Sequence, residues 1–124
     1  MAKGRVLIAE DEATLAWVEQ FNLEFEGYEV LVAPEGRAAV QALDTFAPDV
    51  LILDVMLPFV DGWSVLESIQ GMPAERRPKV ILVSAAAGVA DRAQSERLHV
   101  ESFLAKPFEI DELLERVAAA VGAA

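Results

Sequence analysis

Short, mostly apolar runs alternate with longer segments of mixed polarity along the whole chain. Such runs suit strands that are covered on both faces, as in a parallel sheet. We expect five strands, at 5–9, 28–33, 50–53, 79–83 and 102–105, each followed by a helix, at 13–26, 34–46, 63–70, 85–98 and 109–121. Because crossovers between parallel strands are right-handed and pack on the sheet, this alternation predicts one parallel sheet with helices on both faces.

Polar residues stand where four of the expected strands end. In chain order they are Glu10 and Asp11, Asp54, Ser84 and Lys106. A lone aspartate after a strand usually forms a turn or caps a helix. In a parallel sheet, however, all of these residues meet at the carboxyl edge, where open α/β sheets place their ligand sites. Their convergence predicts a functional site at that edge.

The composition is that of one globular domain, residues 1–124, with a single core. Hydrophobic residues make up 54% of the chain and charged residues 25%, which argues against intrinsic disorder. The net charge of −11 argues against direct nucleic-acid binding, because phosphate contacts need clustered Lys and Arg. The chain starts without a secretory signal pattern and has no membrane-length apolar stretch, so we expect a cytoplasmic protein with no membrane partner. The absence of cysteine excludes disulfides and thiolate metal sites.

The strand-end residues and their neighbours resemble those of the response-regulator receiver domain of two-component signalling systems. The matching motifs are Glu10-Asp11, Asp54, Met56-Leu57-Pro58, Asp61-Gly62, Ser84-Ala85 and Phe103-Leu104-Ala105-Lys106-Pro107-Phe108. The resemblance extends from Arg5 to Val121. It implies an α/β fold, a single doubly wound (βα)5 flavodoxin-like domain with a parallel five-stranded sheet in the order 2-1-3-4-5. The alternation of strands and helices does not determine this order by itself.

The resemblance implies that Asp54 accepts a phosphoryl group from a phosphohistidine of a sensor histidine kinase or of a histidine phosphotransfer protein. A carboxylate is a competent nucleophile for this transfer, which depends more on positioning and charge neutralisation than on covalent machinery. By the same resemblance, Lys106 pairs with Asp54 and then with the phosphoryl oxygens. Ser84 moves to bond these oxygens, and Phe103 moves inward with Ser84. Taken singly, these three residues would be read as a surface lysine, a helix cap and a core aromatic.

A divalent cation is expected among the carboxylates. Glu10, Asp11 and Asp54 would repel one another unless a cation lay between them. Hard oxygen ligands suit Mg²⁺, or Mn²⁺ in its place. The resemblance adds the backbone carbonyl of Met56 as a ligand and lets Glu10 act through a water molecule. We expect a phosphoacceptor that assists its own phosphoryl transfer and dephosphorylation, not an enzyme with a separate substrate.

The residues beside the acceptor bear on how long the phosphoryl group stays. By the resemblance, Met56 and Ala86 border the path of the attacking water. Neither side chain can orient water through a hydrogen bond, so we expect a long-lived aspartyl phosphate. Met56→Asn should then shorten its lifetime.

Two surfaces are candidates for passing the signal on. The alanine-rich segment 85–98 has few large apolar anchors, so a small differential contact would shift its position. The fourth helix, fifth strand and fifth helix are therefore the expected output face, for a downstream protein, a fused effector or a homodimer partner. On the first helix, Trp17, Phe21 and Phe25 recur every fourth residue. We interpret this stripe as the edge of the core more than as an interface.

Three other classes of protein compete with this interpretation. A flavodoxin-like nucleotide binder needs a first loop that donates to phosphate, whereas Glu10-Asp11-Glu12 would repel it. A haloacid-dehalogenase-like phosphatase has a second carboxylate two residues after its nucleophile, where this chain has Met56. A pseudo-receiver, a binding module without phosphorylation, usually lacks one of the acidic pair, the acceptor or the lysine. This chain retains all of them, and the pseudo-receiver stays as the alternative.

Overall fold

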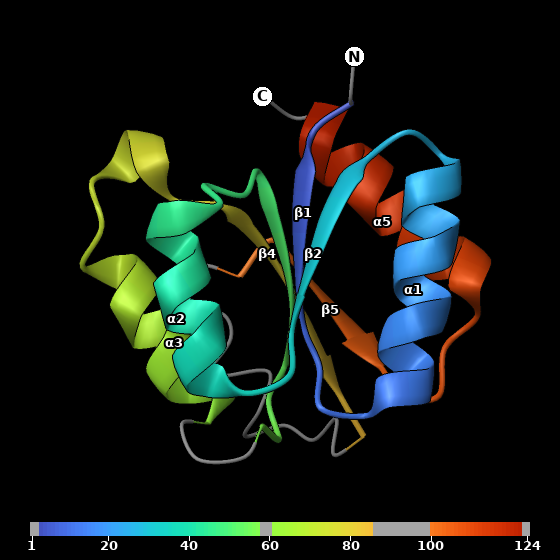
Figure 1. The fold of residues 1–124 in the computed structure, drawn as a ribbon, viewed down its shortest axis with the longest axis horizontal. Coiled ribbons are helices and arrows are strands. Elements are labelled where there is room, and N and C mark those ends of the chain that lie inside the picture. The colour runs from blue at the N-terminus through green and yellow to red at the C-terminus, as the bar shows by residue number, and fades with distance from the viewer. Residues whose placement is uncertain (1–2, 58–60, 86–99, 123–124) are drawn as a thin grey trace.

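Five parallel strands form one sheet with helices on both of its faces (Figure 1). The computed structural model describes residues 3–57, 61–85 and 100–122. The strands are β1 (Arg5–Ala9), β2 (Glu29–Ala33), β3 (Val50–Asp54), β4 (Lys79–Ser84) and β5 (Ser102–Ala105). Their order is β2-β1-β3-β4-β5, and every neighbouring pair is parallel. The doubly wound flavodoxin-like architecture is therefore confirmed.

Two helices cover each face of the sheet in the described part of the chain. They are α1 (Ala13–Phe25) and α5 (Ile110–Gly122) on one face, and α2 (Gly36–Thr45) and α3 (Gly62–Gln70) on the other (Figure 1). The element ends differ from the expected ones by a residue or two, as helix and strand ends commonly do. A short 3-10 turn, Ala74–Arg76, lies in what was expected to be a plain loop. The helix expected at 85–98 falls almost wholly outside the described residues.

The buried side chains divide into two cores, one on each side of the sheet. Successive residues of a strand point to opposite faces. Leu7 and Leu51 accordingly pack beneath α2 and α3, whereas Val6 and Val50 pack beneath α1 and α5. All five residues of β3 are buried, as its unbroken apolar run predicts. None of the described helices is long and apolar enough to cross a membrane.

Helix α1 turns a different face to the sheet from the one expected. Its buried residues are Ala16, Glu19 and Leu23. Trp17, Phe21 and Phe25 are 63%, 55% and 82% exposed, so their interpretation as core edge is wrong. Each residue turns the helix by about 100°, which places these aromatic positions on the side opposite the buried ones. The face of α1 that packs on the sheet therefore carries a small, an acidic and an aliphatic side chain.

Candidate functional site

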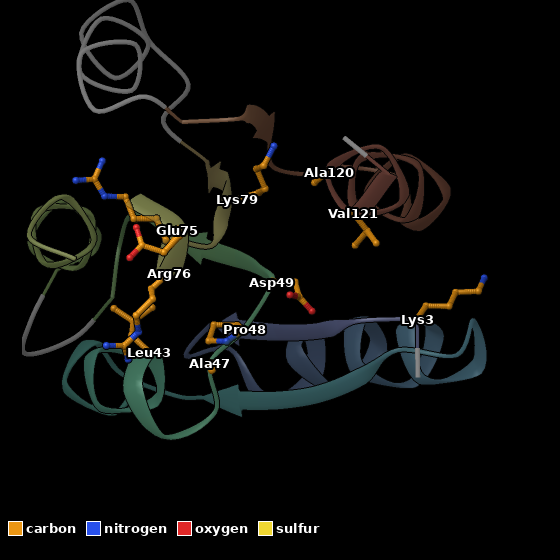
Figure 2. A pocket seen from close by; sticks show the side chains of 11 residues that line it. Lys3, Leu43, Ala47, Pro48, Asp49, Glu75, Arg76, Lys79, Ala120 and Val121 are labelled. Carbon is orange, nitrogen blue, oxygen red and sulfur yellow. The ribbon is translucent and has the colours of Figure 1, made fainter. Parts of the chain in front are cut away.

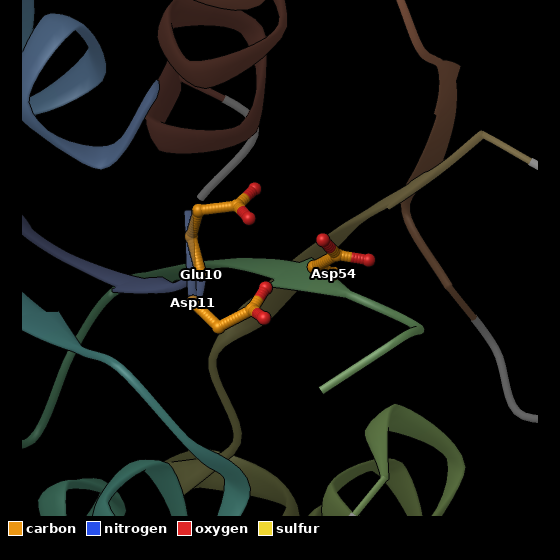
Figure 3. A group of neighbouring side chains, drawn as sticks. All are labelled: Glu10, Asp11 and Asp54. Atoms are coloured by element: carbon orange, nitrogen blue, oxygen red, sulfur yellow. The ribbon is translucent and has the colours of Figure 1, made fainter. Parts of the chain in front are cut away.

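Three carboxylates gather at the carboxyl edge of the sheet, where β1 and β3 end side by side. Glu10 and Asp11 follow β1, and Asp54 is the last residue of β3. One oxygen from each side chain lies within 4.8 Å of the others (Figure 3). Glu10 and Asp54 are buried, whereas Asp11 is exposed at the mouth of the site. The parallel topology therefore brings together residues that are more than forty positions apart, at about the spacing a shared cation needs.

Lys106 joins the two buried carboxylates from the end of β5. Its Nζ lies 2.8 Å from Asp54 Oδ2 and 2.9 Å from Glu10 Oε1. Burial by itself lowers the pKa of Lys106, but the hydrogen bonds to Asp54 and Glu10 raise that pKa above its usual value. Lys106 is consequently a permanent cation at physiological pH. It is not an ordinary surface lysine, since only 17% of its side chain is exposed.

The acidic cluster carries more negative charge than Lys106 balances. Burial raises the pKa of Glu10, the hydrogen bonds from Lys106 and from the Glu12 N–H oppose this rise, and the charge of Asp54 adds to it. Three carboxylates against one ammonium leave an excess of negative charge in a mostly buried site. Hard oxygen donors at this spacing fit a divalent cation such as Mg²⁺. The donor set therefore supports the expected metal site.

The connection from β3 to α3 holds Asp54 in place. The N–H of Met56 donates to Asp54 Oδ1 at 2.9 Å, and the N–H of Gly62 donates to the carbonyl of Val55 at 3.0 Å. A Cβ at Gly62 would lie 2.7 Å from Val55 Cα and 2.8 Å from the carbonyl oxygen of Asp54. Asp61 caps α3 by accepting from the N–H of Ser64 at 2.9 Å. The Asp-Gly pair thus does more than form a turn, because Gly62 lets α3 begin against the backbone of the site.

The two residues with an expected switching role lie on the neighbouring strands. Ser84 is the last residue of β4 and is buried. Its carbonyl accepts a hydrogen bond from the N–H of Lys106 at 2.9 Å, which ties the two strand ends together. Phe103 lies on β5, half-buried against the core under α2 and α3. Ala86, the other residue expected beside the water path, lies outside the described residues.

Sequence reasoning missed Glu19, a buried carboxyl on α1. It is 1% exposed, and within the described structure neither of its oxygens has a hydrogen-bond partner. Burial raises the pKa of Glu19 to about 8; the negative charge of Glu10 adds to the rise and Lys106 opposes it. The side chain is therefore mostly protonated at neutral pH. Its spacing from Ala16 and Leu23 was the available signal, but the aromatic stripe of Trp17, Phe21 and Phe25 pointed to the opposite helix face.

A larger depression lies at the opposite, amino edge of the sheet (Figure 2). Its volume is about 480 Å³, against about 340 Å³ for the depression beside Lys106. Its arginines are already engaged: Arg76 pairs with Asp44 at 3.5 Å, and Arg77 donates to the carbonyls of Met72 and Gln70 at 2.9 Å. The larger hollow is therefore not the better candidate, and the chemistry lies at the carboxyl edge.

A five-stranded flavodoxin-like sheet with an acidic pocket and a bridging lysine defines a class of α/β domain. Comparison with known families shows to which family of this class the chain belongs. The family described as the response regulator receiver domain matches residues 6–118, so the chain belongs to the response regulator receiver domain family. The resemblance inferred from the motifs is thereby confirmed.

Individual relatives agree with this assignment. The uncharacterized transcriptional regulatory protein YkoG of Bacillus subtilis is 36% identical over 121 residues, which are 98% of this chain and 52% of that protein. The signal receiver domain of a protein named as a putative LuxO repressor of Vibrio parahaemolyticus has a TM-score of 0.89 at 30% identity, covering 97% of this chain and 91% of that one. The chain spans about half the length of the curated relatives it matches.

One solved relative contains a metal ion. The receiver domain of the sensor histidine kinase PA1611 of Pseudomonas aeruginosa has a TM-score of 0.85 at 28% identity, covering 96% of this chain and 98% of that one. It holds a magnesium ion in its active-site cleft. The family thus binds Mg²⁺ at an acidic pocket, and this chain has an acidic cluster of the fitting kind.

Proposed function

We propose that residues 1–124 are one phosphoacceptor domain, in which Asp54 accepts a phosphoryl group from a sensor histidine kinase or a histidine phosphotransfer protein. The observation that carries this proposal is the arrangement around Asp54. This buried carboxylate has one oxygen on the N–H of Met56 and the other on the ammonium of Lys106. Glu10 and Asp11 complete an acidic pocket beside it.

In the proposed reaction a carboxylate oxygen of Asp54 attacks the phosphorus of the phosphohistidine. The new P–O bond forms as the P–N bond breaks, and the imidazole leaves. Lys106, held 2.8 Å from Asp54, is close enough to move onto a phosphoryl oxygen and neutralise part of its charge. Glu10, Asp11, Asp54 and the carbonyl of Met56 would hold Mg²⁺, or Mn²⁺ in its place. When bound, the metal supplies further neutralisation of the phosphoryl charge.

The same residues make the domain a participant in its own chemistry. The domain assists both phosphoryl transfer and the later hydrolysis, without a separate substrate of its own. A pseudo-receiver that binds partners without phosphorylation is the alternative. The contacts of Lys106 with Glu10 and with the acceptor Asp54, and the nearness of Asp11, favour the phosphoacceptor, because a binding module has no need for that constellation.

The proposed output begins at Ser84 and Phe103. A new phosphoryl oxygen gives the Ser84 hydroxyl a new acceptor, and Phe103 responds on the adjacent strand. The face formed by the helix expected at 85–98, β5 and α5 then changes its affinity for a downstream protein, a fused effector or a second copy of the domain. Relatives named as transcriptional regulators support a protein effector, and the charge of −11 argues against direct DNA contact by these residues. A kinase donor of this kind acts in the cytoplasm, which is the proposed location.

Incubation with acetyl phosphate and Mg²⁺ tests the acceptor. Intact-mass analysis should show one added phosphoryl group in the native chain and none in Asp54→Asn. Asp44→Asn removes the same charge from an exposed position and should be labelled normally. EDTA should suppress labelling of the native chain, because the carboxylates then repel one another and the phosphoryl group. Full labelling of Asp54→Asn contradicts the assignment. If neither the native chain nor Asp44→Asn is labelled, the result favours the pseudo-receiver.

A further inference from the structure

Met56 presents its side chain to solvent beside the proposed acceptor. The residue is 68% exposed, whereas its neighbours Val55 and Leu57 are 5% and 7% exposed. Its backbone is fixed there, because its N–H donates to Asp54 Oδ1 at 2.9 Å. The other large hydrophobic residues that are exposed in the described structure lie on α1 and β2; they are Trp17, Phe21, Phe25 and Leu31. Packing does not account for a long apolar side chain at the mouth of an acidic pocket, so we consider the chemistry of its sulfur.

The sulfur of Met56 is the most accessible one in the described part of the chain. The sequence contains no cysteine and three methionines. Met72 is half-buried and packs against the core under α2 and α3. Met1 lies outside the described residues. Because oxidation of sulfur requires that the oxidant reach it, Met56 should react before Met72.

Oxidation of Met56 requires a peroxide, of which hydrogen peroxide is the simplest. A lone pair of the sulfur attacks one peroxide oxygen. The S–O bond forms as the O–O bond breaks, and the leaving hydroxide and the proton on the new S–O group combine as water. The sulfur has then lost two electrons and become a sulfoxide, which is polar but uncharged. Oxidation therefore leaves the charge of the pocket formed by Glu10, Asp11 and Asp54 unchanged.

The new polar oxygen lies on the side from which water reaches the acceptor. Asp54 is 5% exposed and its strand is packed on both faces, so attacking water comes from the solvent side, where Met56 stands. A thioether is a weak hydrogen-bond acceptor, whereas a sulfoxide oxygen accepts readily and can orient this water. We propose that Met56 is a redox modification site, at which oxidation to the sulfoxide shortens the lifetime of the phosphoryl group on Asp54. The effect on the lifetime rests on the proposed function, whereas the oxidation itself does not.

Graded treatment with hydrogen peroxide, followed by peptide mapping in a mass spectrometer, tests the modification. One added oxygen should appear on Met56 at doses that leave Met72 mostly unmodified. Methionine sulfoxide reductases for both epimers, supplied with a dithiol, should remove it: the oxygen leaves as water and the dithiol becomes a disulfide. Equal oxidation of the two residues, or a preference for Met72, overturns the inference.

The lifetime of the aspartyl phosphate tests the consequence. After removal of the peroxide, the oxidised chain is labelled with acetyl phosphate and Mg²⁺ and followed by intact mass. It should lose its phosphoryl group roughly two- to tenfold faster than the untreated chain, which is the range that one added hydrogen bond supplies. Peroxide should not change this rate in Met56→Leu, which has no sulfur at that position. The matched control Met72→Leu should respond to peroxide as the native chain does, and reductase treatment should restore the slow rate.

The outcomes separate this inference from the proposed function. An unchanged or slower loss of the phosphoryl group from the oxidised chain contradicts the inference. So does an acceleration by peroxide that persists in Met56→Leu, because another residue would then be responsible. If the untreated native chain takes up no phosphoryl group, the proposed function is wrong and the effect on the lifetime with it. The peptide map still decides in that case whether Met56 is the site of oxidation.

Discussion

Glu19→Gln should make the domain more resistant to alkaline pH. In the folded state burial, together with the charge of Glu10, raises the pKa of Glu19 to about 8, against an ordinary value of 4.5. The folded protein therefore holds this proton more tightly than the unfolded chain does. The stabilising contribution is complete below about pH 4.5 and is lost progressively as the pH rises towards 8. A glutamine of nearly the same shape has no proton to lose.

The size of the effect follows from the width of this pKa shift. Each unit corresponds to about 1.4 kcal/mol, so the full change between the acid and alkaline limits is about 5 kcal/mol. Between about pH 6 and pH 9, the part that remains to be lost is roughly 3 kcal/mol. That is a substantial fraction of the 5–15 kcal/mol or so by which small domains are stable.

Urea unfolding at several pH values and constant ionic strength measures this directly. The free energy of unfolding of Glu19→Gln minus that of the native chain should grow by roughly 3 kcal/mol across this pH range. Taking the difference between two proteins removes the titration of groups that both share. Glu24→Gln, an exposed carboxylate on the same helix, should show a difference that stays nearly constant. A difference for Glu19→Gln that is equally flat would refute the reasoning, because Glu19 would then ionise as freely as a surface residue.

Four other expectations concern the site and its output. Gly62→Ala should destabilise the domain by about 1–3 kcal/mol in thermal unfolding, because a Cβ there meets backbone at 2.7 Å; a cost near zero would show that the loop yields. Without metal, Lys106→Met should lower the free energy of unfolding by about 3–5 kcal/mol, because it leaves two buried carboxylates uncompensated. Added Mg²⁺ should raise the stability of this variant by more than it raises that of the native chain. Met56→Asn should hasten loss of the phosphoryl group in a mass-spectrometric time course. An unchanged or slower rate would contradict the idea that the orientation of the attacking water limits hydrolysis of the aspartyl phosphate. With a beryllofluoride phosphoryl mimic, hydrogen exchange should change along 85–106 and not along 13–26. The reverse pattern would place the switch on the first helix.

The order of strands and helices was readable from the sequence because it depends on local pattern. The run that ends at Asp54 is apolar at every position, so it suits a strand buried on both faces, and β3 is such a strand. Parallel topology then requires strand ends to share one edge. For that reason the sequence by itself predicts that Glu10, Asp11 and Lys106 lie near Asp54. The motifs added the strand order, which the alternation of elements leaves open.

Tertiary structure decided the matters that depend on which surfaces meet. The aromatic stripe and the positions of Ala16, Glu19 and Leu23 offer α1 two rival faces. The helix face that packs on the sheet is the one that buries the carboxyl of Glu19 and leaves Trp17 exposed to solvent. Likewise, the contacts of Lys106 with Glu10 and Asp54 arise between segments far apart in the chain. The close approach of Gly62 to Asp54 and Val55 depends on how the chain returns to the end of β3. Hydrophobic periodicity reports only how a helix is patterned, whereas its orientation is determined by the shape and charge of what it packs against.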